Sequence, residues 1–119
     1  MKHYIASLIE KAFQAAYGDP PGFPAFHGYI TAHFIAEAYK KAGSIDTEKF
    51  IDALEGLKIA SPAGELEMRA CDHQVTLPMY LGVTKFSDKY GCVISTDIIT
   101  LKGDEVLPTC EEIAKARGK

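Results

Sequence analysis

Close cysteine pairs, basic clusters and long apolar runs are absent from this 119-residue sequence, and each absence argues against a class of protein. The three cysteines, Cys71, Cys92 and Cys110, form no close C-x-x-C pair, so a structural zinc site has little support. The 13 Lys and Arg residues are outnumbered by 16 Asp and Glu residues and form no basic cluster, which argues against a nucleic-acid surface. No apolar run approaches the roughly 20 residues of a membrane-spanning helix.

The chain nevertheless contains enough apolar material for one folded domain. Hydrophobic residues make up 47% of it, with six Phe and six Tyr, which excludes a disordered chain. We therefore expect residues 1–119 to form a single unit. The first residues enter a helix-patterned segment with charges spread through it, so a signal peptide is not expected in this chain. The three thiols allow one disulfide bridge, whose partners the spacing does not assign.

Two long helices are predicted in the first half of the chain. Apolar side chains recur at steps of three and four over residues 3–17, and Gly18 ends that helix before a Pro-Pro pair. Residues 25–42 are apolar on nearly every side until the Lys40-Lys41 pair, so we expect a helix that is buried on more than one face.

A third helix is predicted over residues 47–56. Asp46 is its N-cap, because Asp commonly accepts a hydrogen bond from the first turn of a helix. Ile45 and Phe50 have the spacing of a hydrophobic staple around this cap. Gly56 marks the exit from the helix.

The period of the pattern changes from helical to two in the second half. Apolar and charged residues alternate over 65–70, apolar residues alternate again over 77–86, and 92–101 is rich in β-branched residues. We expect the last two segments to pair as an antiparallel hairpin. Thr109 and Glu112 have the capping-box spacing of a short helix. Helices followed by strands suggest α+β locally, or a piece of a larger α/β protein.

The residues that could carry chemistry do not combine into a site for catalysis or metal binding. His27 and His33 are six apart and would point in different directions on a helix, so they are not expected to hold one ion. In Cys71-Asp72-His73, adjacent side chains on an extended segment point to opposite sides, which favours a polar turn over a working dyad. We therefore predict no enzyme activity, no metal and no cofactor.

The aromatic residues at the Pro-rich entry to the second helix are the strongest candidates for a binding site. Phe23, Phe26 and Tyr29 stand next to His27 at the point where a loop enters a buried helix. Such junctions often line a cleft, and small-ligand sites combine apolar walls with a few polar groups. The alternative, in which these rings belong only to the core, stays open.

The order of several short motifs resembles that of a known family. These motifs are Ala15-Ala16-Tyr17-Gly18-Asp19-Pro20-Pro21, Gly28-Tyr29, Lys41-Ala42-Gly43-Ser44, Ala53-Leu54-Glu55-Gly56-Leu57, Ser61-Pro62-Ala63-Gly64, Arg69-Ala70-Cys71-Asp72-His73-Gln74 and Tyr80-Leu81-Gly82. Together they resemble the C-terminal part of type I periplasmic solute-binding proteins. That group contains the branched-chain amino acid (Leu/Ile/Val) receptors of ABC importers. The resemblance covers about residues 5–101.

This resemblance implies a fold and a function. The fold would be a two-lobe α/β structure that closes on its ligand like a hinge, of which residues 1–119 form the C-terminal portion. The function would be non-catalytic: the protein binds an amino acid or a similar small polar solute and presents it to an ABC permease, in the periplasm or outside the cell. By the same analogy Phe26, His27 and Tyr29 lie beside the hinge and wall the ligand.

The chain departs from this family in its length. Such receptors are much longer and begin with a secretion signal, so the segments expected to bind the amino and carboxylate groups of the ligand are missing here. The isolated piece would leave sheet edges and apolar helix faces uncovered, which leads us to expect self-association. Two alternatives stay open: a stand-alone dimerisation or regulatory ligand-sensing domain derived from the same fold, and a small Cys/His metal or thiol enzyme.

Overall fold

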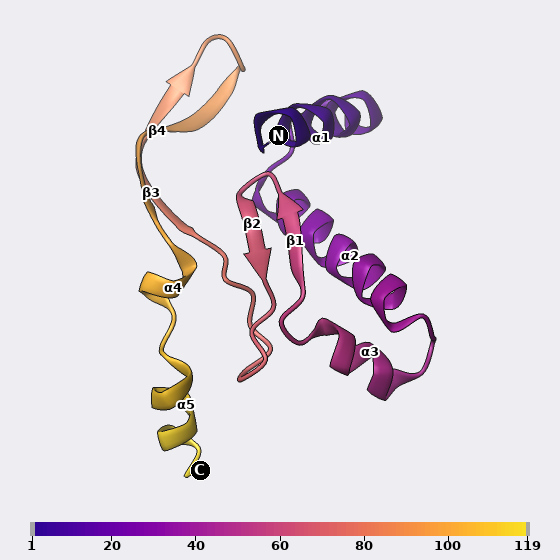
Figure 1. Cartoon of the computed structure of the whole chain (residues 1–119). Helices are drawn as coiled ribbons and strands as arrows, with labels where there is room; N and C mark the ends of the chain where they lie inside the picture. Colours follow the sequence, from indigo (N-terminus) through magenta and orange to yellow (C-terminus); the bar gives the residue numbers. More distant parts are fainter. Residues whose placement is uncertain (1, 119) are drawn as a thin grey trace. The chain divides into compact units, whose positions relative to one another are not determined.

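The computed structural model describes residues 2–118 and, among these, the side chains from Leu8 onward. It divides into two compact units, one ending at Val75 and one beginning at Thr76. The first unit contains helices α1 (Lys2–Tyr17), α2 (Phe23–Ala42) and α3 (Thr47–Leu54) and strands β1 (Lys58–Ser61) and β2 (Gly64–Glu67). The second contains strands β3 (Met79–Ser87) and β4 (Cys92–Leu101) and helices α4 (Gly103–Val106) and α5 (Cys110–Ala116) (Figure 1). The predicted order, helices first and antiparallel strands second, is confirmed.

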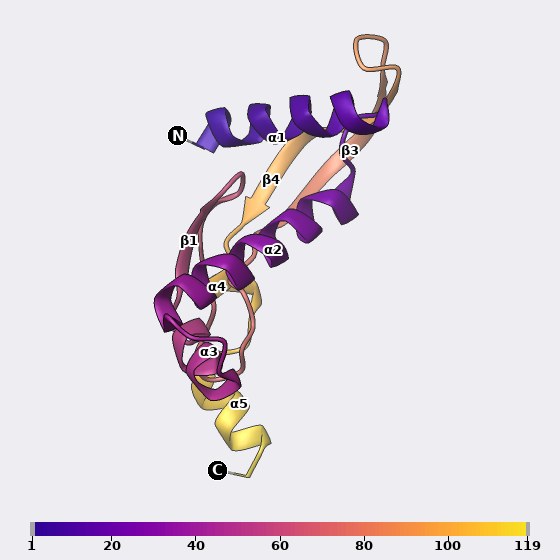
Figure 2. The ribbon, with the colours of Figure 1, turned by 90° about the vertical axis from the view of Figure 1, so that its right-hand side faces the viewer.

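The core of the first unit lies between α2, α3 and the β1–β2 hairpin. Because residues four apart share one side of a helix, Ile30, Phe34 and Ala38 form a buried stripe along α2. Ile59 of β1 and Leu66 of β2 stand opposite each other in the antiparallel register and are also buried. Helix α2 contacts both α3 and β1, so one face of this helix closes the core (Figure 2).

The expectation that α2 is buried on more than one face is wrong for this chain. Ile35 and Tyr39 lie away from the buried stripe and are exposed, as is Phe23 in the first turn. Among its described residues, the first unit has only a two-stranded sheet, which covers a single side of the helix. The helix also starts earlier than predicted, at Phe23, because the fixed φ of Pro24 suits a first turn.

The start of α3 follows the prediction and its end does not. The Asp46 carboxylate accepts a hydrogen bond from the Lys49 backbone N–H at 3.0 Å, so this N-cap is confirmed. The helix ends at Leu54 rather than at 56. Gly56 has a left-handed φ of +67° and donates its backbone N–H to the Met68 carbonyl at 2.9 Å, which leads the chain out of the helix and into β1.

The predicted hydrophobic staple at the start of α3 is wrong. Ile45 is 93% exposed, which is too much for a side chain that packs against the helix. The Phe50 ring packs instead against the Tyr39 ring of α2, with 4.5 Å between the ring centroids. This aromatic contact joins α3 to α2.

The β1–β2 hairpin differs most from the sequence-based expectation. The pattern does not indicate β1, which is only four residues long and contains Ala60 and Ser61. Exposed and buried residues alternate along β1, and the strand is recognised only by its pairing with β2. The segment 65–70, predicted as one strand, belongs to β2 only as far as Glu67. The chain then turns back on itself, and the Arg69 N–H donates to the Gln74 carbonyl at 2.8 Å.

The predicted hairpin of the second unit is confirmed, with β3 and β4 paired antiparallel. Strand β3 begins at Met79, two residues later than predicted, because Pro78 has no N–H to donate to a ladder. Gly91 supplies the left-handed φ of +65° in the turn between the strands. The register shifts between Leu81 and Val83, where β4 contains one extra residue and forms a bulge.

The predicted capping box at the start of α5 is confirmed. The Thr109 hydroxyl accepts a hydrogen bond from the Glu112 N–H at 3.2 Å, and the Glu112 carboxylate accepts one from the Thr109 N–H at 2.7 Å. The backbone bond and the contact with the Thr109 hydroxyl favour the charged carboxylate, so they hold the pKa of Glu112 below its usual range.

Candidate functional site

The predicted site residues lie in the first two turns of α2. Phe26, His27 and Tyr29 are all half-buried. The centroid of the His27 ring lies 3.9 Å from that of Phe23 and 5.6 Å from that of Phe26. The imidazole therefore lies close to two aromatic rings of its own helix, as part of one contiguous cluster.

Tyr29 belongs to a different stripe of α2. Its ring centroid lies 5.8 Å from that of His33, and Nε2 of His33 lies 3.8 Å from Oε1 of Glu37. Lys40 Nζ donates to the same Glu37 oxygen at 2.6 Å, and this hydrogen bond holds the pKa of Glu37 below its usual range. Nδ1 of His33 is buried and has no hydrogen-bond partner among the described residues. His27 and His33 therefore have separate surroundings.

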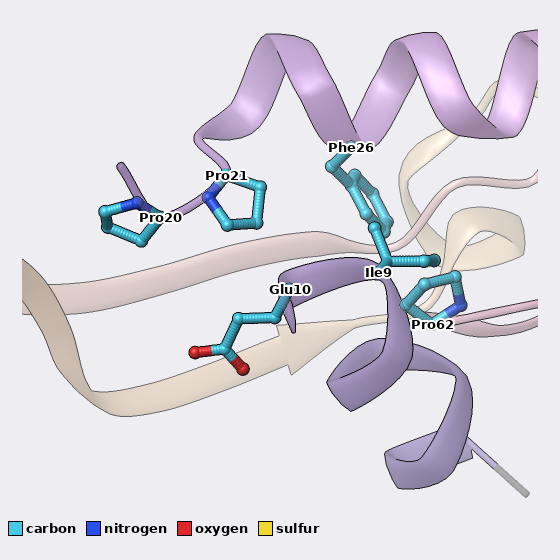
Figure 3. A pocket seen from close by; sticks show the side chains of 6 residues that line it. All are labelled: Ile9, Glu10, Pro20, Pro21, Phe26 and Pro62. Atoms are coloured by element: carbon cyan, nitrogen blue, oxygen red, sulfur yellow. The ribbon is translucent and has the colours of Figure 1, made fainter. Parts of the chain in front are cut away.

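A pocket of about 280 Å³ opens in the first unit beside Phe26. Its lining comes from α1, the Pro-rich loop, the start of α2 and the turn between β1 and β2: Ile9, Glu10, Pro20, Pro21, Phe26 and Pro62. Figure 3 shows the side chains of Ile9, Phe26 and Pro62 close together, with the Glu10 carboxylate pointing away from them. The pocket therefore presents an apolar wall with one carboxylate at its side, a composition that small-molecule sites use.

The structure brings one of the three predicted site residues to this pocket. Phe26 lines it, whereas His27 and Tyr29 are not among its lining residues. Ile9 and Pro62 come from segments far from Phe26 in the sequence, so no local pattern singles them out. The Pro-Pro pair at 20–21 is the one signal that could have found the pocket, because two prolines restrict the connection between α1 and α2.

The segment Cys71-Asp72-His73 forms a turn, as predicted. The Asp72 side chain is 1% exposed and accepts a hydrogen bond from Nε of Arg69 at 3.1 Å. His73 has a left-handed φ of +57°, and its Nε2 lies 2.8 Å from Oε1 of Glu55. The carboxylate and the imidazole thus contact other residues rather than each other.

Among the residues that the structure describes, there is neither a metal-binding cluster nor a helix that could span a membrane. Among the side chains described from Leu8 to Gly118, no three His, Cys, Asp or Glu residues come close enough to hold a metal ion. In the same part of the chain, no helix is both long and apolar enough to cross a bilayer. Cys92, at the start of β4, is a free cysteine.

Comparison with known proteins identifies a family and several similar structures. The family model for periplasmic binding proteins matches residues 5–89. The crystal structure of an ABC-type branched-chain amino acid transporter protein from Rhodopseudomonas palustris CGA009 is 29% identical to this chain, with a TM-score of 0.77. The match covers 89% of this chain and 29% of that one. An amino acid ABC transporter substrate-binding protein from Pseudomonas fluorescens Pf-5 is also 29% identical, with a TM-score of 0.71, over 88% of this chain and 28% of that one.

A third similar structure contains a bound ligand. It is a solute-binding protein of an ABC transporter from Rhodopseudomonas palustris BisB5 in complex with 3,4-dihydroxybenzoic acid, 26% identical with a TM-score of 0.73. The match covers 82% of this chain and 26% of that one. No curated protein matches the chain. The chain thus spans less than a third of each of these three proteins and corresponds to a fragment of their fold.

Proposed function

This chain belongs to the periplasmic binding protein family, and on that premise we propose that it is the C-terminal part of the solute-binding component of an ABC importer. The family match over residues 5–89 carries this proposal, and the likeness of fold over 89% of the chain supports it. In this role the protein binds a solute without transforming it. Its partners are the solute and the permease of the importer, and its place is the periplasm.

The solute that we propose is an amino acid or a similar small polar molecule with an apolar portion. Ile9, Phe26 and Pro62 offer a surface on which an aliphatic side chain or an aromatic ring can pack. Glu10, the charged residue of the lining, would attract the ammonium group of an amino acid and repel the carboxylate of an aromatic acid. Charge therefore favours an amino acid over a benzoic acid.

We further propose that His27 and Tyr29 supply polar groups to the solute site from outside the lining of this pocket. Both are half-buried on the first turns of α2, within a few residues of Phe26. An imidazole and a phenol can each donate or accept a hydrogen bond, which suits a solute that carries both an ammonium and a carboxylate group.

An NMR titration of the ¹⁵N-labelled chain tests this assignment. Leucine, phenylalanine and 3,4-dihydroxybenzoate are added in turn, and we expect the amino acids to shift the amides of Phe26, His27 and Tyr29. Phe26→Ala should abolish these shifts, because it removes the apolar wall. Phe13→Ala is the matched control, since Phe13 is also half-buried but lies outside the lining. Shifts that survive Phe26→Ala, or no shifts in α2 with any solute, would contradict the proposal.

One observation favours a second function for the same chain. The second unit exposes a series of large apolar side chains on β3 and β4, which a free-standing dimerisation or regulatory ligand-sensing domain would use for self-association. We therefore include self-association in the proposal. An upstream in-frame coding region with a signal sequence would favour the importer component, and a translation start at Met1 would favour the independent domain.

A further inference from the structure

The β3–β4 hairpin exposes many large apolar side chains on its two strands. Eight large apolar side chains on its strands are close to half exposed or more: Met79, Tyr80, Leu81, Val83, Phe86, Val93, Ile98 and Ile99. A hairpin of two strands is marginally stable in water, and the largest apolar patch on a protein surface, about 300–600 Å² on a typical monomer, is often a functional one. This surface is therefore a candidate for binding another protein surface.

The two faces of the hairpin differ in charge. A Cβ atom built on Gly82 would lie 3.4 Å from side-chain carbons of both Ile98 and Ser95, so these residues share the face of Gly82. Alternation along β3 and the register with β4 complete this uncharged face: Tyr80, Gly82, Thr84, Phe86, Val93, Ser95, Ile98 and Thr100. The opposite face, here the lysine face, consists of Met79, Leu81, Val83, Lys85, Ile94, Thr96, Ile99 and Leu101. Asp97, the extra residue of the bulge, has its carboxylate 3.2 Å from the Thr96 hydroxyl.

We propose that the uncharged face packs against the same face of a second copy of this chain and forms a two-fold symmetric dimer. The inference rests on the self-association proposed above and assigns a surface to it. Tyr80 and Phe86 supply aromatic anchors of the kind that dominate interface energies. Two identical faces without charged side chains can meet with no like charges opposed, and a net charge of −3 per chain opposes association only weakly. A strongly charged partner would find no complementary charge on this face.

The available area fits a small dimer interface. Tyr80, Phe86, Val93 and Ile98 are between 47% and 63% exposed. Taking roughly 150–200 Å² for each large side chain, they present about 400 Å² of apolar surface. With the Ser and Thr side chains of the face included, a dimer would bury about 1,000 Å² in total, the size at which specific interfaces begin. We therefore expect a weak dimer, because interfaces at the low end of the size range are mostly transient.

Sedimentation velocity on the 119-residue chain and two matched variants tests the assignment. Val93 on the uncharged face and Val83 on the lysine face have the same side chain and are 63% and 61% exposed. We expect the unmodified chain to change from monomer to dimer as its concentration is raised. Val93→Lys should weaken the dimer at least tenfold, because it places two charges in the interface. Val83→Lys should leave the dimer unchanged.

The possible outcomes distinguish a failure of the assigned dimer surface from a failure of the proposed solute-binding function. A chain that stays monomeric at all concentrations overturns both self-association and this surface, while the solute-binding proposal still depends on the NMR titration. A dimer that responds equally to both variants overturns the surface alone. Far-UV circular dichroism verifies that each variant folds. If Val93→Lys does not fold, Thr84→Lys replaces it, because Thr84 is an exposed polar residue of the same face.

Discussion

The ion pair between Arg69 and Asp72 allows a test of how much a buried charge pair contributes to the stability of the first unit. The two side chains are 13% and 1% exposed, and the guanidinium contacts both carboxylate oxygens. Asp72→Ala leaves a nearly buried guanidinium without this carboxylate, and breaking a buried pair from one side costs about 3–5 kcal/mol. A small domain is stable by only about 5–15 kcal/mol. The variant should therefore unfold at a much lower urea concentration than the unmodified chain, as followed by circular dichroism.

Two further variants make this test specific. Glu37 and Lys40 form another pair three residues apart, but on the surface of α2, so Glu37→Ala should leave the urea midpoint unchanged. Replacing both partners, with Arg69→Met and Asp72→Leu together, should cost less than Asp72→Ala alone, because neither charge of this pair then remains. An Asp72→Ala chain as stable as the unmodified one would refute the argument from the buried pair. Asp72 would then need a role other than stability.

Three more changes have expected outcomes. Leu66→Ala removes a side chain buried in the first unit and should cost about 2–5 kcal/mol in urea unfolding, whereas Leu81→Ala, at an exposed position, should cost little. Gly103→Ala should lower the melting temperature, because its Cβ would lie 2.5 Å from the Thr76 carbonyl carbon. The folded-state pKa of Glu112 is lowered, so its capping stabilises α5 above the ordinary glutamate pKa and is lost as pH falls through the lowered value. Glu112→Gln should remove this pH dependence of α5 helicity, measured by NMR shifts of its amides.

The features that the sequence predicts correctly depend on neighbouring residues along the chain. Asp46 and the Thr109–Glu112 pair cap their helices because the capped N–H groups lie within three residues of the capping side chain. The hairpin of β3 and β4 follows from two β-rich runs on either side of a turn that contains Gly91. Short-range geometry decides these features, so a single sequence contains all that is needed to find them.

The features that the sequence misses depend on contacts between distant segments. Strand β1 has little strand preference of its own and exists through its pairing with β2. The pocket beside Phe26 takes Ile9 from one helix and Pro62 from a turn more than 50 residues later, a combination that no spacing rule identifies. The predicted staple at Ile45 failed for the same reason, because the Tyr39 ring of α2 occupies the surface of Phe50.

The exposed face of α2 and the exposed hairpin have one explanation. Both carry large apolar side chains that are exposed, and the chain spans less than a third of the length of its structural relatives. The prediction for a longer protein that contains this segment follows if further layers cover both faces of the hairpin. There Val93→Lys and Val83→Lys should each lower the melting temperature, since either would bury an unpaired charge. In the 119-residue chain only Val93→Lys should act, and it should act on dimer formation instead of folding. The melting temperatures of the 119-residue chain and of the longer protein, each with either variant, are compared. Equal effects of the two variants in the short and the long chain would contradict this account of the hairpin.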